Sequence, residues 1–137
     1  MWFVYALLAA IFAALVSIAG KIALQGINPV FLTTARAIIM ALFLILFSFS
    51  LGKFKEGIPE LNTKTVVFLI ISAVAGALSW LFGFSALKYA RPTTVASIDK
   101  SSILFVILLS WLFLGEKITL KTVIGGILIF TGLILVQ

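Results

Sequence analysis

Residues 30–51 read VFLTTARAIIMALFLILFSFSL, an apolar stretch in which Arg36 is the only charged side chain. A helix needs about 20 apolar residues to cross the roughly 30 Å hydrocarbon core of a bilayer. Because a lipid-facing backbone group finds no water there, a single segment can cross only if it satisfies its own backbone groups as a helix. This stretch is long enough, so we predict that it forms a transmembrane helix.

Apolar stretches of similar length occur along the whole chain. The composition is 64% hydrophobic and 10% charged, and the mean hydropathy is +1.33, whereas about a quarter of the residues in soluble domains are charged. We therefore predict an all-α membrane protein, with one transmembrane domain over residues 1–137 that forms a bundle of five transmembrane helices. The other four helices are predicted at approximately 2–24, 65–87, 93–114 and 120–136, the last being the shortest.

Turn-forming and capping residues separate these helices. Proline is accepted in the first turn of a helix, so Pro92 fits the start of the fourth helix. Gly115 is suited to end that helix, and Thr119 is suited to cap the start of the fifth. The connecting loops are too short to fold on their own, so any functional site is predicted to lie between the helices.

Several classes of function are disfavoured by composition. The chain contains no Cys and no His, which removes disulfides, thiolate chemistry and the most common metal-binding side chain. We therefore predict no enzymatic activity, no metal site and no cofactor. The formal net charge is +6, but the basic residues are spread over all loops and do not form a cluster of the kind that binds nucleic acid. Lipid headgroups explain the charge better, and we expect no nucleic-acid partner.

Four charged side chains lie deeper inside the predicted helices than Lys121, the second residue of the fifth: Lys21, Arg36, Asp99 and Lys100. With a rise of about 1.5 Å per residue, all four fall within roughly 12 Å of one membrane surface. Charges inside a bilayer cost about 2.5 to 3.5 kcal/mol each, so they usually pair or line a wet cavity. Adjacent residues in a helix do not face one another, which favours pairing of Asp99 with Lys21 or Arg36 over pairing with Lys100.

Several of these side chains could instead have a purely structural role. Those of Lys21 and Arg36 could equally extend to the interface and contact lipid headgroups. Asp99 is too short to do so, which favours a role in pairing or in a transport pathway. Trp80 could line a cavity, although plain packing is more common, and Ser79 lies on a face of small residues that permits close helix packing. The candidate substrate-binding residues are Lys21, Arg36, Asp99, Lys100, Ser79 and Trp80.

Three stretches of the chain resemble the EamA domain of the drug/metabolite transporter superfamily, and the similarity covers essentially the whole sequence. They are residues 19–21 (AGK) followed by Arg36, residues 80–96, and residues 110–119 (SWLFLGEKIT) leading into two glycines. The resemblance implies a membrane transporter of small metabolites. Many relatives have a helix-kinking proline near the position of Ile103, whereas this chain has no proline there and carries the charged residues Asp99 and Lys100 just before it.

The resemblance also implies an arrangement of subunits. Most relatives look like two five-helix units joined in one chain, and this chain would be one half of such a ten-helix inverted-repeat fold. An odd number of helices places the ends of a unit on opposite sides of the membrane, so a fused second unit would be inverted, and inverted repeats are a basis of alternating access. A single unit regains that symmetry by pairing with an oppositely inserted copy, which predicts an antiparallel homodimer.

An antiparallel homodimer requires dual topology, which means that copies of the chain insert in both orientations. The charges of the short loops bear on this, because the orientation of a membrane protein follows the distribution of Lys and Arg between its two sides. When all basic residues are counted, the two sides of the membrane carry equal numbers, and insertion in both orientations is expected. If Lys21, Arg36 and Lys100 line a cavity and are discounted, the remaining bias predicts one orientation with the N-terminus in the cytoplasm. The side of the N-terminus carries Lys53, Lys55, Lys64, Lys117 and Lys121, and the other side carries Lys21, Arg36, Lys88, Arg91 and Lys100.

We predict a transporter of small metabolites in the cell (cytoplasmic) membrane that works by alternating access. The net positive charge of the candidate site favours a substrate with a carboxylate or phosphate group, such as an amino acid or an organic anion. One alternative is an exporter of cationic compounds like the small multidrug resistance proteins, which rely on an acid in their first helix, where residues 2–24 have none. Another is a scaffold subunit that does not transport, in which Asp99→Asn would leave activity intact.

Overall fold

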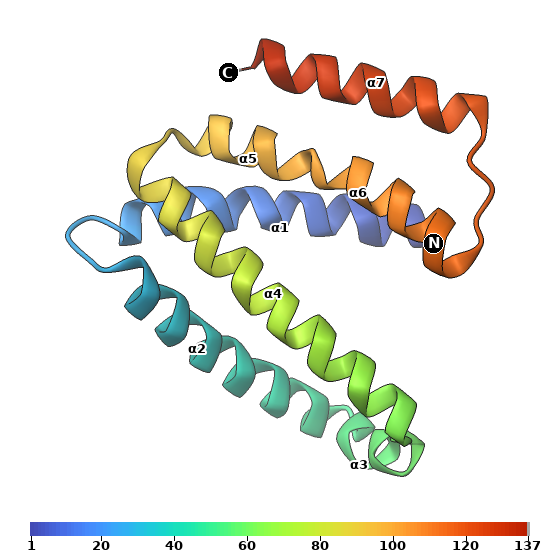
Figure 1. The fold of residues 1–137 in the computed structure, drawn as a ribbon. Coiled ribbons are helices and arrows are strands. Elements are labelled where there is room, and N and C mark those ends of the chain that lie inside the picture. The colour runs from blue at the N-terminus through green and yellow to red at the C-terminus, as the bar shows by residue number, and fades with distance from the viewer. Residues whose placement is uncertain (137) are drawn as a thin grey trace. The chain divides into compact units, whose positions relative to one another are not determined.

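The computed structural model describes residues 1–136, and every regular element in that range is helical (Figure 1). The chain divides into two compact units, which are described separately. One unit combines Met1–Lys21 with the chain from Tyr89 onward, and the other comprises Ile22–Lys88. The all-helical fold predicted from the apolar stretches is therefore confirmed for the described residues.

The first unit holds most of α1 (Trp2–Ala23) together with α5 (Pro92–Lys100), α6 (Ser102–Leu109), the π-helical turn η2 (Ser110–Leu114) and α7 (Leu120–Leu135). Helix α7 packs against α5 and α6 (Figure 1). A Cβ atom added at Gly126 would lie 3.2 Å from Leu104 Cδ2 and 3.6 Å from Ile107 Cδ1. Gly126 therefore lets α7 approach α6 closely.

The capping residues of this unit act as the sequence predicts. Pro92 occupies the first turn of α5, where its missing N–H costs no helical hydrogen bond. Gly115 has a φ of 68° and ends η2 in the left-handed region. Thr119 Oγ1 accepts a hydrogen bond from the Thr122 amide at 3.2 Å and caps α7. These three predictions are confirmed.

The segment predicted at 93–114 is interrupted in its middle at Ser101, between α5 and α6. The Ser101 amide donates to Ile98 O and the Leu104 amide to Ser101 O, each at 3.0 Å and each over three residues. Ser101 Oγ also donates to Ile98 O, at 2.6 Å. Ser101 keeps helical dihedral angles (φ −63°, ψ −16°), so the interruption is one tighter turn within the segment, and no proline lies near Ile103.

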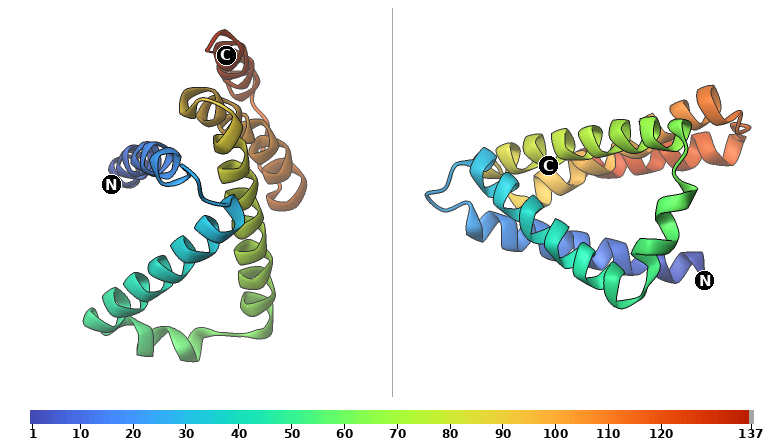
Figure 2. Two further views of the ribbon diagram at one scale, coloured as in Figure 1. Left: turned by 90° about the vertical axis from the view of Figure 1, so that its left-hand side faces the viewer. Right: turned by 90° about the horizontal axis from the view of Figure 1, so that it is seen from below.

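The second unit holds α2 (Pro29–Ser50), α3 (Lys53–Gly57), the 3₁₀ turn η1 (Ile58–Glu60) and most of α4 (Thr63–Tyr89). Helices α2 and α4 diverge toward the end at which α3 and η1 connect them (Figure 2). Asn28 Oδ1 caps α2 by accepting from the Val30 amide at 2.8 Å, and Asn62 Oδ1 accepts from the Thr65 amide at 2.9 Å near the start of α4. The connection between the helices predicted at 30–51 and 65–87 therefore contains two short helices.

Four helical segments are long and apolar enough to cross a membrane, namely Trp2–Ala23, Pro29–Ser50, Thr63–Tyr89 and Pro92–Leu114. Most large apolar side chains in these segments are exposed in the isolated chain, as is expected of helices whose outer faces contact lipid. The multi-pass membrane fold is thus supported. Helix α7 has 16 residues, fewer than a full crossing usually needs, so the count of five spans stays a prediction.

Candidate functional site

Arg36 lies about 10 Å along α2 from its start, at 1.5 Å per residue, and its guanidinium covers two aromatic rings of α4. The Arg36 Cζ atom is 4.4 Å from the centroid of the Trp80 ring and 5.2 Å from that of Phe84. Because Trp80 and Phe84 are four residues apart, they lie on the same face of α4. A cation at these distances is attracted to the negative faces of the rings, so the contact fixes the position of the guanidinium.

The same guanidinium has an unused hydrogen-bond donor. Arg36 Nη1 is buried and has no hydrogen-bond partner among the described residues. The two rings attract the positive charge but do not replace the oxygen acceptors that an N–H group loses on leaving water. A buried donor without an acceptor costs about 1 to 3 kcal/mol, and more when it is charged. Arg36 therefore carries a buried donor for which the described residues supply no acceptor.

A groove of about 640 Å³ lies beside this contact, between α2 and α4. Trp80 joins the two features, since it both lines the groove and lies below Arg36. Thr33 and Thr34 supply hydroxyl groups to the wall, but these donate to Pro29 O at 2.7 Å and to Val30 O at 2.9 Å. The wall is mainly apolar, and is formed by Val30, Thr33, Thr34, Ala37, Ser72, Ala73, Val74, Gly76, Ala77, Leu78, Trp80 and Leu81.

Lys21 occupies a different place, in the first unit. Its Nζ atom donates to Ala90 O at 2.9 Å, and Ala90 directly follows the last residue of α4. Lysine side chains commonly satisfy the free carbonyl groups at helix ends. The contact therefore gives Lys21 a structural partner next to the connection that leads into Pro92.

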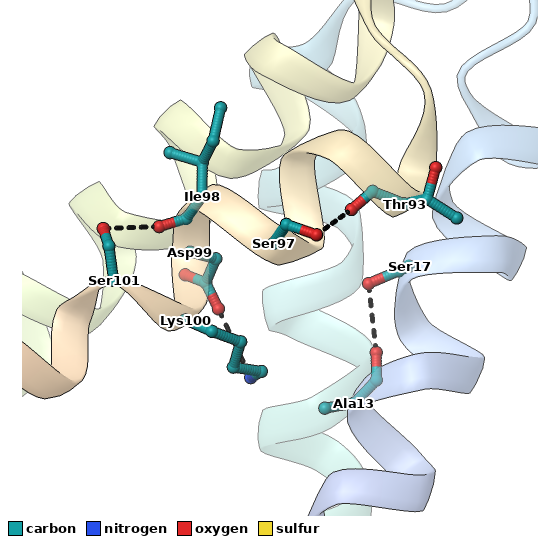
Figure 3. A network of polar contacts seen from close by, with 8 residues as sticks. All are labelled: Ala13, Ser17, Thr93, Ser97, Ile98, Asp99, Lys100 and Ser101. Carbon is teal, nitrogen blue, oxygen red and sulfur yellow. Dashed lines mark hydrogen bonds and ion pairs between the residues drawn. The ribbon is translucent and has the colours of Figure 1, made fainter. Parts of the chain in front are cut away.

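Asp99 and Lys100 lie beside the helix break at Ser101 (Figure 3). Asp99 Oδ2 is 3.5 Å from Lys100 Nζ, and the two side chains are 61% and 59% exposed. The expectation that Asp99 would pair with Lys21 or Arg36 in preference to Lys100 was therefore wrong. Their Cβ atoms do point in different directions, but two flexible and exposed side chains next to an interrupted turn can still bring their charged ends together.

The candidate residues are thus distributed over several places. In the second unit, Arg36 and Trp80 come together, whereas Ser79 is exposed on α4 and is not part of the groove wall. In the first unit, Asp99 and Lys100 form a pair and Lys21 bonds to Ala90.

The sequence prediction did not include the groove wall or Phe84 in the site. The adjacent hydroxyls Thr33 and Thr34 in an otherwise apolar run, and the four-residue spacing of Trp80 and Phe84, are the signals that could have pointed to them. No group of three or more His, Cys, Asp or Glu side chains within the described residues is arranged to hold a metal ion.

Two comparisons with known proteins cover all or nearly all of the chain, and both indicate a transporter. The family model described as the EamA-like transporter family matches residues 1–137. A protein of Sinorhizobium sp., described as an uncharacterized transporter in the cobO 3′ region, is 35% identical over 134 residues, which cover 98% of this chain and 94% of that relative. No solved structure matches the chain significantly.

Proposed function

Because the chain belongs to the EamA-like transporter family and is therefore a multi-pass membrane transporter, we propose that it carries small metabolites, either organic anions or amino acids, by alternating access. The cytoplasmic membrane of a prokaryotic cell is its proposed location. The observation that carries the proposal is Arg36, a cation inside a membrane-length helix whose buried Nη1 has no partner among the described residues. Charges inside membrane helices commonly mark substrate pathways.

The proposed transport pathway includes all the candidate residues of the sequence prediction. Arg36 and Trp80 are supported by their mutual contact and by the adjacent groove. Asp99 and Lys100 are supported by their position at a helix break, because interrupted helices supply binding groups in many transporters. Lys21 and Ser79 complete the set, with Lys21 close to the loop that follows α4.

The transporting unit is proposed to be an antiparallel homodimer. In this proposal α7 is the fifth crossing, and each copy is one half of a ten-helix inverted-repeat fold. Alternating access then needs two oppositely inserted copies, because the chain provides one five-helix unit. The equal number of basic residues on the two predicted sides of the membrane supports insertion in both orientations.

Flux through reconstituted protein tests this function. The full chain is placed in liposomes loaded with a mixture of organic acids, amino acids and quaternary ammonium compounds, and the solutes released are measured by mass spectrometry against protein-free liposomes. We expect release of an anionic or zwitterionic solute, and loss of that release in Arg36→Gln. Release of only the cations would contradict the proposal in favour of a multidrug exporter, and no protein-dependent release would favour a scaffold subunit.

A further inference from the structure

We propose that the substrate bound by Arg36 and the α2–α4 groove is an organic monocarboxylate with an apolar body, and not a zwitterionic amino acid. This inference rests on the proposed transport function and specifies the class of substrate. It follows from the charges, hydrogen-bond donors and volume of the second unit.

The anionic head is set by Arg36. Its Nη1 is a buried donor without a partner among the described residues, and its guanidinium lies over the rings of Trp80 and Phe84. Rings hold the cation in place but leave its charge uncompensated, so a carboxylate supplies what is missing: an acceptor oxygen and a negative charge. Charge-assisted hydrogen bonds from arginine to a carboxylate are among the strong ones in proteins.

The site can compensate only one negative charge on the substrate. Arg36 is the only charged residue of α2, and the charged residues of α4 are Lys64 near its first turn and Lys88 near its last. None of the described residues that form the groove wall is charged. Arg36 adjoins the wall through its contact with Trp80, so one cation is available beside the groove. A second carboxylate on the substrate would enter an apolar groove without a partner, which is strongly unfavourable.

An ammonium group on the substrate would find no acidic side chain as a partner in the groove. The only acidic residues between positions 22 and 88 are Glu56 and Glu60, and both belong to the short elements α3 and η1 outside the long helices. The hydroxyls of Thr33 and Thr34 can offer lone pairs but no negative charge. A zwitterion would therefore lose the hydration of its ammonium without compensation by an ion pair.

The apolar body is set by the groove. Its volume of about 640 Å³ is of the size that accommodates small organic molecules. The small residues Ala37, Ala73, Gly76 and Ala77 leave the space open. Trp80 offers an aromatic wall that leads to Arg36. The groove therefore suits an aromatic or branched hydrocarbon group attached to the carboxylate.

Three probes with the same phenylethyl body test the inference: 3-phenylpropionate, phenylalanine and phenethylamine. They present an anion, a zwitterion and a cation respectively. A full-length chain with Trp2→Phe and Trp111→Phe keeps Trp80 as its only tryptophan, and its fluorescence in a neutral detergent reports binding at the groove. We expect 3-phenylpropionate to change the Trp80 emission in a saturable way, with an affinity about tenfold or more above that of the other two probes.

Two arginine variants locate the interaction. Arg36→Gln is expected to weaken 3-phenylpropionate binding by about tenfold to a hundredfold, while Arg91→Gln, an exposed arginine outside the groove, leaves it unchanged. Equal binding of phenylalanine, tighter binding of phenethylamine, or full binding by Arg36→Gln would overturn the inference. The comparison of the three probes needs no change at Arg36, so it remains decisive if Arg36→Gln does not fold.

A lipid competition and a flux measurement complete the test. Phosphatidylglycerol added to the micelles is expected to leave 3-phenylpropionate binding intact, and competition by this lipid would show that the groove is a lipid site and overturn the inference. Proteoliposome flux of the same probes separates the two proposals. If phenylalanine or phenethylamine crosses and 3-phenylpropionate neither binds nor crosses, transport stands and the substrate class is wrong. If 3-phenylpropionate binds but no solute crosses, the site stands and the proposed function fails.

Discussion

The contact between Arg36 and Trp80 predicts a graded response to changes of the ring. Trp80→Leu leaves the guanidinium over Phe84 alone, at 5.2 Å, and removes part of the groove wall. Cation–π contacts contribute about 0.5 to 2 kcal/mol, which corresponds to a rise in the KM of transport of about 2- to 30-fold. Trp80→Phe keeps a ring and is expected to retain most of the affinity. Initial rates of uptake into proteoliposomes at increasing substrate concentration measure both effects.

Trp111→Leu is the matched control for this prediction. Trp111 is an exposed tryptophan of η2, so its replacement changes the same type of side chain away from the groove. We expect its KM to equal that of the unaltered protein. An equal rise of KM in Trp111→Leu and Trp80→Leu would mean that loss of a membrane-facing ring, and not loss of the Arg36 contact, is responsible.

Asp99 allows transport to be separated from stability. Its ion pair with Lys100 is exposed, and such pairs contribute about 0 to 1 kcal/mol. We therefore expect Asp99→Asn to leave thermal unfolding in detergent almost unchanged while transport falls, since a carboxylate of the proposed pathway is removed. Glu116→Gln removes an acid from the loop after η2 as a control. Unchanged transport by Asp99→Asn would place Asp99 outside the pathway.

At the scale of the helices, two neighbouring glycines of α7 are predicted to differ. A Cβ at Gly126 meets Leu104 Cδ2 at 3.2 Å, whereas a Cβ at Gly125 has nothing within 4 Å. Gly126→Val is therefore expected to separate α7 from α6 and to destabilise the protein by about 1 to 3 kcal/mol. Gly125→Val is the control, because it makes the same substitution at the neighbouring position of the same helix. The difference between their unfolding midpoints in detergent measures the packing effect.

Equal destabilisation by the two valine variants would contradict this packing arrangement. It would show that the face of α7 with Gly125 is also covered, which is the result expected if a second copy packs there. Measuring both variants at low and high protein concentration in detergent separates these cases, because a contact between copies depends on concentration and a contact within the chain does not.

The helical elements were largely predictable because their signals are local. Apolar length, Pro92, Gly115 and Thr119 each act within a few residues of the chain. The interruption at Ser101 was not predicted, because neither a proline nor a glycine marks it in the sequence, although the Ser101 hydroxyl bonds to Ile98 O. A serine can either point outward or bond to the preceding turn, and the sequence does not distinguish these conformations.

The candidate site was predictable only in part, because its contacts join residues far apart in the chain. Arg36 and Trp80 were each selected as polar or aromatic residues of membrane helices, but their contact depends on how α2 and α4 pair. Apolar helices carry no periodic pattern that fixes this pairing. The partner of Asp99 was wrongly predicted for a related reason: a rule about regular helices was applied to the turn in which the helix is interrupted.

For the whole molecule, the orientation in the membrane shows whether the basic residues inside the membrane segments influence insertion. If the cations of the membrane segments count toward topology, the two sides are equal and both orientations form. Arg36 lies over aromatic rings and Lys21 bonds to a carbonyl group, but insertion happens before such contacts are complete. We therefore expect all ten basic residues to count, and we predict that copies of the chain insert in both orientations.

Single cysteines in this Cys-free chain measure the orientation directly. Gln25→Cys lies in the loop before α2 and Leu61→Cys in the loop before α4, on opposite predicted sides, and both are exposed uncharged positions whose replacement keeps the basic residues unchanged. In intact cells, an impermeant thiol reagent is expected to label a substantial fraction of each variant, and permeabilised cells give the total. Labelling of Gln25→Cys alone would place every N-terminus in the cytoplasm. An inverted pair could then not form from this chain, and alternating access would require a different partner subunit.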